Sequence, residues 1–128
     1  MILAVLYLVV GITFAALAGW ASSNQMRVIW RLLAWVISGA AFAAHIGYEH
    51  FRLRNSPVTT ALHASLAVGL GAFGLAAAAN IHGRGSGSSH QRSLLLLALV
   101  AWPVLTAVPA FVIALGSATS LAFRRRGV

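Results

Sequence analysis

The segment Ala40–Leu66, AAFAAHIGYEHFRLRNSPVTTALHASL, holds a short polar stretch between two apolar runs. It contains the only acidic residue of the chain, Glu49, together with His45, His50 and His63. An Asn-Ser-Pro turn signal at 55–57 separates the two runs, and a serine followed by a proline is typical of a helix start. The pattern therefore predicts two helices joined by a tight turn, with the ionisable side chains close to that turn.

The composition of the whole chain indicates a membrane protein. Apolar residues make up 60% of the 128 residues and charged residues 8%, and the mean hydropathy is +0.89. Soluble domains carry about 25% charged residues, so a water-soluble fold is not expected. The chain has no cysteine, which excludes disulfide scaffolds and thiolate metal sites.

Four apolar runs are long enough to cross a membrane. A hydrocarbon core of about 30 Å requires about 20 residues of helix. We predict helices at about 2–21, 27–51, 57–81 and 94–123 in one domain of residues 1–128, with a mobile Gly/Ser-rich aqueous loop at 82–93. Pro103 and Pro109 should kink or locally open the last helix, with Thr106 or a neighbouring helix satisfying the freed carbonyls. The predicted fold is an all-α integral membrane bundle of four transmembrane helices with up-down topology.

The net charge of +8 comes from nine arginines without a lysine. The arginines lie at the ends of the apolar runs, where they snorkel to anionic lipid head groups, so we do not expect nucleic-acid binding. The predicted head-group residues are Arg27, Arg31, Arg52, Arg54, Arg124, Arg125 and Arg126. Five arginines would lie on the side of the termini and four on the other side, so the positive-inside rule favours both termini in the cytoplasm.

Small residues mark the faces through which the helices would pack. In the run 57–81, Ala67, Gly71, Gly74 and Ala78 share one face with His63, and Gly69 lies on another. Small residues at such intervals let a neighbouring backbone approach closely. A chain this short buries little surface by itself, so we expect self-association or other membrane subunits as partners, in addition to the lipid bilayer.

The spacing around the turn brings ionisable groups together. His45 lies nine residues before Arg54 and His63 nine residues after it, so both imidazoles should lie about 10 Å from the tip of the hairpin. Glu49 lies one helical turn from His45 on the same face. Ionisable groups inside the apolar slab are costly, and their presence there suggests a function.

Four interpretations of these groups remain open from the sequence. The first is a polar cluster that fixes helix packing, with Glu49 hydrated near the tip and paired to Arg52 or Arg54. The second is b-type haem held between the axial ligands His45 and His63. The third is a proton or ion relay at Glu49 and His50. The fourth is a metal site of His45, Glu49 and His63.

The first interpretation gives the functional expectation. We expect a non-enzymatic subunit or oligomeric component of a membrane complex that contains an intramembrane His/Glu cluster. The alternatives are an electron-transfer subunit that binds haem b and a small proton-coupled transporter or channel that uses Glu49.

Overall fold

Four helices make up the described part of the chain. The computed structural model describes residues 2–82 and 89–126, with side chains described for 2–81 and 93–123. The helices are α1 (Ile2–Trp20), α2 (Asn24–Phe51), α3 (Pro57–His82) and α4 (Ser89–Arg126). Each is long and apolar enough to cross a membrane, which agrees with the predicted all-helical class.

The helix bounds differ from the prediction at the start of α2 and at both ends of α4, which ends at Arg126 and not at residue 123. α2 begins at Asn24 and not at residue 27, because Ser23 caps it: the Ser23 Oγ accepts the Met26 N–H at 3.2 Å. Such a cap stabilises a helix by about 1 kcal/mol. The predicted loop 82–93 was too long, because α4 already begins at Ser89. Its remaining part, residues 83–88, lies outside the described residues.

The predicted start of α3 is confirmed by its capping contacts. The Ser56 hydroxyl accepts the Thr59 N–H at 3.2 Å and lies 2.8 Å from the Thr59 hydroxyl. Pro57 occupies the first helical position, where its missing N–H costs no hydrogen bond. The turn before α3 is therefore fixed by local chemistry.

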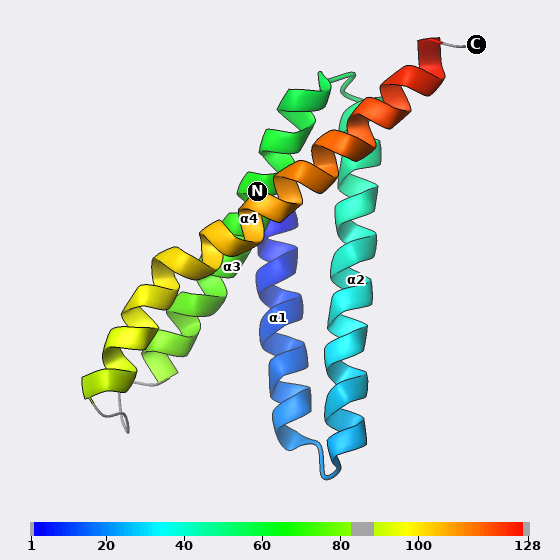
Figure 1. Ribbon diagram of the computed structural model, residues 1–128. Coiled ribbons are helices and arrows are strands. Elements are labelled where there is room, and N and C mark those ends of the chain that lie inside the picture. Colours follow the sequence, from blue (N-terminus) through cyan, green and yellow to red (C-terminus); the bar gives the residue numbers. More distant parts are fainter. Residues whose placement is uncertain (1, 83–88, 127–128) are drawn as a thin grey trace.

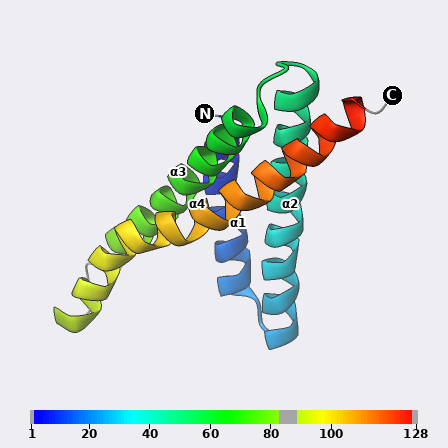
Figure 2. The ribbon, with the colours of Figure 1, turned by 45° about the horizontal axis from the view of Figure 1, so that its top comes forward.

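The helices form two antiparallel pairs that diverge. α1 and α2 run side by side, and α3 and α4 form a second pair that leans away from them (Figures 1 and 2). The contact between α3 and α4 is the most extensive, whereas α2 and α3 touch far less. The two helices joined by the predicted tight turn, α2 and α3, are therefore not each other's main packing partners, and α3 packs mainly against α4 and α1.

Glycines on two faces of α3 permit these contacts. A Cβ atom on Gly71 would lie 2.7 Å from the Tyr7 Cβ atom of α1, and one on Gly69 would lie 3.4 Å from the Ala107 Cβ atom of α4. A side chain at 71 would therefore push the two helices apart. The small residues of α3 therefore allow close helix contacts, as predicted, and the helix that packs on the Gly71 face is α1.

The core is small and lies where three helices meet near the α2–α3 turn. It consists of Ile46 from α2, Ala61 and Ala64 from α3, and Ala114 from α4. Among the described residues, the buried apolar side chains other than Leu3 and Ile46 are all alanines. The large apolar side chains instead cover the outer surface, as expected for helices surrounded by lipid.

α4 runs as one helix through both of its prolines. The Thr106 hydroxyl donates to Trp102 O at 2.9 Å and to Pro103 O at 3.1 Å. These are not the carbonyls that the prolines free, which belong to the residues four positions earlier. The helix is therefore not opened at the prolines and Thr106 is not their compensating donor, whereas a kink and a donor from a neighbouring helix stay predictions.

Candidate functional site

The carboxylate of Glu49 is the centre of the polar contacts at the α2–α3 turn. Glu49 is 5% exposed, although it lies in the last turn of α2. His63 Nδ1 of α3 lies 3.1 Å from Oε1 and 3.2 Å from Oε2, and the Asn55 side-chain amide donates to Oε2. His45 Nε2 lies 3.7 Å from Oε1. We call Glu49, His45, His63 and Asn55 the Glu49 cluster.

The backbone after α2 places Asn55 at the carboxylate. Arg52 caps the helix by donating its N–H to Tyr48 O at 2.9 Å. Arg54 then adopts a left-handed conformation with φ of 54°, which costs a non-glycine residue about 1 kcal/mol. The chain reverses there, and the Asn55 N–H donates to Glu49 O at 3.2 Å. Asn55 thus binds Glu49 through both its backbone and its side chain.

Two of the sequence expectations about Glu49 were wrong. Glu49 was expected to be hydrated near the tip, but it is buried. It was also expected to pair with Arg52 or Arg54, yet both are exposed, and the ion pairs of the described residues join Glu49 only to His45 and His63. The side chains of α2 and α3 pack over the carboxylate, while the arginines point outward after the helix has ended.

His50 is separate from this cluster. It is 6% exposed, and its ring stacks edge-on against Phe51 with centroids 5.0 Å apart. Neither of its ring nitrogens has a hydrogen-bond partner, nor do His45 Nε2 and Thr60 Oγ1. Each such buried polar atom costs about 1–3 kcal/mol unless it gains a partner. This end of the molecule therefore holds unused hydrogen-bonding capacity close to its one carboxylate.

The arrangement suits proton exchange better than haem or metal binding. Bis-histidine ligation requires both nitrogens to point at one iron with the macrocycle between the rings. Here both nitrogens approach Glu49 Oε1, at 3.1 Å and 3.7 Å, so the carboxylate occupies the space between them. No group of three or more His, Cys, Asp or Glu side chains within the described residues has the geometry to hold a metal ion.

The predicted head-group arginines fall into three groups. Arg27 and Arg31 lie in the first two turns of α2 and are exposed, as are Arg52 and Arg54 at its other end. The side chains of Arg124, Arg125 and Arg126 lie outside the described residues, and so does Arg84. The structure therefore places two arginine pairs at opposite ends of α2.

Sequence reasoning missed three polar residues that join the helices. The Tyr7 hydroxyl of α1 is partly buried and donates to Ser38 O of α2 at 3.1 Å. The Asn80 amide donates to Ala76 O at 2.9 Å and to Leu95 O of α4 at 2.6 Å. Asn55 was expected only as a turn residue. For Asn55 and Asn80, the signal in the sequence was a side-chain amide inside or beside an apolar helix, because such an amide needs a hydrogen-bond partner there.

Comparison with known proteins gives no relative from which a role could be transferred. No family model matches the chain, and neither a curated protein nor a solved structure matches it. The roles of Glu49 and its neighbours therefore have to follow from their contacts and burial.

Proposed function

We propose that the chain is a non-enzymatic, multi-pass membrane protein that exchanges protons at Glu49. Four helices of sufficient length and apolarity and their alternating directions (Figure 1) support an up-down arrangement with both termini on one side. The arginine count favours the cytoplasm for that side. The observation that carries the proposal is a buried carboxylate with two imidazole neighbours and, within the described residues, no arginine partner.

The chemistry of these neighbours makes the Glu49 charge reversible. An arginine would remain charged at all relevant pH values and would hold the carboxylate ionised. Histidine changes its charge near neutral pH and can therefore give a proton to the carboxylate or take one from it. A neutral Glu49 beside neutral imidazoles and an ionised Glu49 beside one imidazolium are both electrically balanced. These two states hold the same number of protons, so a proton can move between the carboxylate and an imidazole without leaving an uncompensated buried charge.

The exposure of the two histidines supports a route for the proton. The His63 side chain is 50% exposed, that of His45 23% and that of Glu49 7%. His63 therefore connects the carboxylate with the molecular surface, while His45 continues the cluster further into α2. A proton would pass between the surface and Glu49 through the His63 ring.

The test measures proton flux into liposomes that contain the full chain and a trapped pH-sensitive dye. Glu49→Gln keeps an acceptor for Asn55 but cannot ionise, so we expect proton flux to fall to the level of empty liposomes. His50→Gln is the matched control, because neither ring nitrogen of His50 is hydrogen-bonded to the carboxylate, and its flux should be retained. Flux that persists in Glu49→Gln would exclude Glu49 as the proton-exchanging group.

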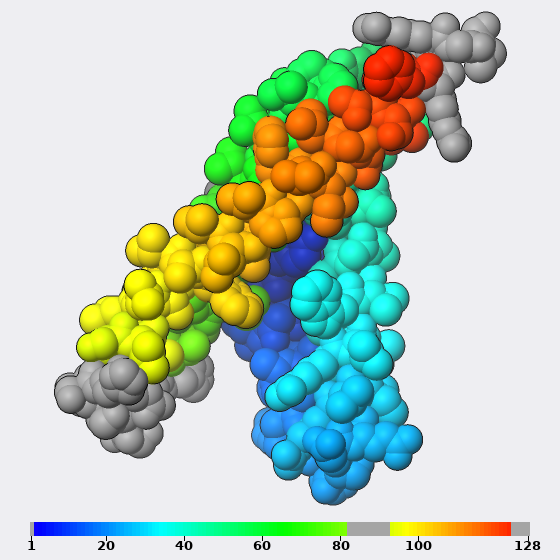
Figure 3. Space-filling view, viewed as in Figure 1, coloured from blue at the N-terminus to red at the C-terminus, as the bar shows by residue number. Residues whose placement is uncertain are grey.

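A second candidate function, that of a component of a membrane assembly, has its own support. The buried apolar side chains are nearly all alanines, and the two helix pairs diverge (Figure 3). Small residues favour close helix contacts in membranes, and open space remains beside Gly19, Gly39, Gly47 and Gly116. Native mass spectrometry from nanodiscs should detect a stable oligomer or a retained partner. A chain that stays monomeric at all concentrations would contradict this role.

A further inference from the structure

A cleft between α1 and α2 lies at the end of the molecule opposite the Glu49 cluster. It encloses about 550 Å³ and is lined by Gly11, Phe14, Ala15, Ala18, Gly19, Arg27, Arg31, Ala34 and Trp35. We call it the arginine cleft. Two arginines thus belong to a cleft whose other lining residues are apolar, a combination that helix packing alone does not require.

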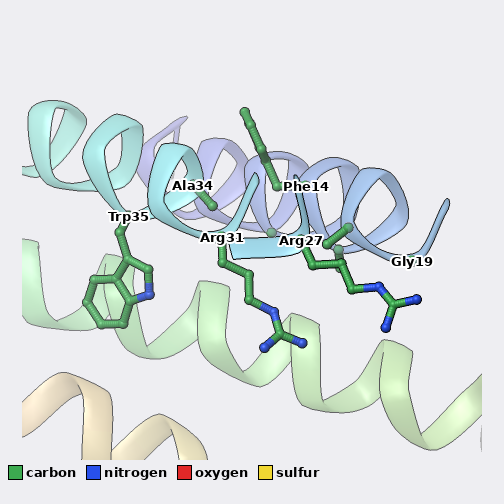
Figure 4. A pocket seen from close by; sticks show the side chains of 9 residues that line it. Phe14, Gly19, Arg27, Arg31, Ala34 and Trp35 are labelled. Atoms are coloured by element: carbon green, nitrogen blue, oxygen red, sulfur yellow. The ribbon is translucent and has the colours of Figure 1, made fainter. Parts of the chain in front are cut away.

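The side chains of α2 make the two ends of the arginine cleft chemically different. Arg27, Arg31 and Trp35 follow one another at intervals of one helical turn, and their side chains project to the same side of α2 (Figure 4). Arg27 and Arg31 lie near the polar connector at 21–23, whereas Trp35 lies deeper in the apolar run. The cleft is therefore cationic near the helix ends and apolar further in.

The charge of this cleft is not balanced within the described part of the chain. Arg27 Nε donates to Ala21 O at 3.4 Å, and no ion pair involves either arginine among these residues. The one acidic residue, Glu49, lies about 27 Å further along α2 than Arg31. Two neighbouring guanidinium groups attract an anion, and their planar, forked donors match the oxygens of a phosphate.

We propose that the arginine cleft binds one anionic phospholipid. The head-group phosphate lies between Arg27 and Arg31, and an acyl chain follows the cleft past Trp35. Ala15 lines the cleft and Gly19 has open space beside it, so both leave room for that chain beside the α1 backbone. A free phosphate would use only the two arginines, whereas a lipid also fills the apolar part. The proposal rests on placement of the chain in a membrane and is independent of proton exchange at Glu49.

Native mass spectrometry of the full chain in a non-ionic detergent tests this site. The chain is titrated in parallel with phosphatidylglycerol, phosphatidylcholine and inorganic phosphate. We expect phosphatidylglycerol to bind about tenfold or more tightly than phosphatidylcholine, because two arginines contact its uncompensated charge. Inorganic phosphate at the same concentration should not displace it. Displacement by inorganic phosphate, or equal binding of both lipids, would overturn the proposal.

Two double variants separate this site from general charge attraction. Arg27→Gln with Arg31→Gln should reduce phosphatidylglycerol binding to the level of phosphatidylcholine. Arg52→Gln with Arg54→Gln removes the same charge from the other end of α2, which does not line the cleft, so the preference for phosphatidylglycerol over phosphatidylcholine should persist even if general head-group contacts weaken. Equal loss in both variants, or no loss in the first, would contradict a defined site. Circular dichroism checks that both variants are folded, and Glu49→Gln should bind lipid like the unmodified chain.

Discussion

At the C-terminal end of α2, the Glu49 carboxylate is buried and contacted by two imidazoles and an amide. At the N-terminal end, Arg27 and Arg31 are exposed beside an open cleft. Within the described residues, the side-chain hydrogen bond of this pair is the one that Arg27 Nε donates to Ala21 O. The carboxylate of Glu49 thus has partners within the protein. The guanidinium groups of Arg27 and Arg31 have no ion-pair partner within the described residues, so their charge must be balanced by the surroundings.

This difference follows from the chemistry of the side chains. A glutamate side chain is short and Glu49 is buried, so α3 and the turn supply its partners. Arginine has a long apolar stem that lets its charged end reach the head groups. The ends of α2 should therefore respond differently to substitution, with large effects on stability near Glu49 and small effects near Arg31.

The largest loss of stability should come from Glu49→Leu. Removal of the carboxylate leaves the partly buried amide of Asn55 and the ring nitrogen of His63 without their acceptor. We expect the free energy of unfolding to fall by about 2–4 kcal/mol. The measurement is unfolding in mixed micelles with increasing SDS, followed by circular dichroism. Glu49→Gln, which retains an acceptor, should lose less, and an equal loss in both variants would show that the hydrogen bonds do not matter.

A smaller loss should follow from Asn55→Ala. This variant removes the amide that donates to Glu49 but keeps the backbone bond from residue 55 to Glu49 O. A hydrogen bond to a charged group contributes about 1.5–3 kcal/mol, so we expect a loss near the lower limit, measured by the same unfolding assay. Asn80→Ala is the matched control, since Asn80 donates only to neutral carbonyls. A greater loss in the control would mean that the carboxylate is not the stronger acceptor.

The smallest change in stability is expected from Arg31→Gln. The side chain is exposed and lacks an ion pair within the described residues, so unfolding should change by no more than about 0.5 kcal/mol. Unfolding is measured here in micelles without anionic lipid. A loss as large as that of Asn55→Ala would mean that Arg31 has a structural partner, and the contrast between the two ends of α2 would fail.

The sequence was sufficient to predict the helical class, the four apolar helices and the turn before α3. These features depend on local quantities: the length of each apolar run, the charge content, and a serine followed by a proline. The spacing of His45 and His63 about the turn also predicted that they lie near Glu49. Periodicity and counting along one hairpin suffice for such contacts, because a tight turn leaves little freedom in register.

The divergence of the two helix pairs and the partners of Glu49 were decided only by the tertiary structure. Which glycine face of α3 receives α1 depends on packing between segments distant in sequence, and no local pattern determines it. The replacement of an arginine by Asn55 as a partner of Glu49 depends on the left-handed Arg54, which reverses the chain just after α2. One backbone angle there directs the amide inward and leaves the guanidinium groups outside. The composition thus determined the solvent and the helices, and the packing geometry determined which side chains meet.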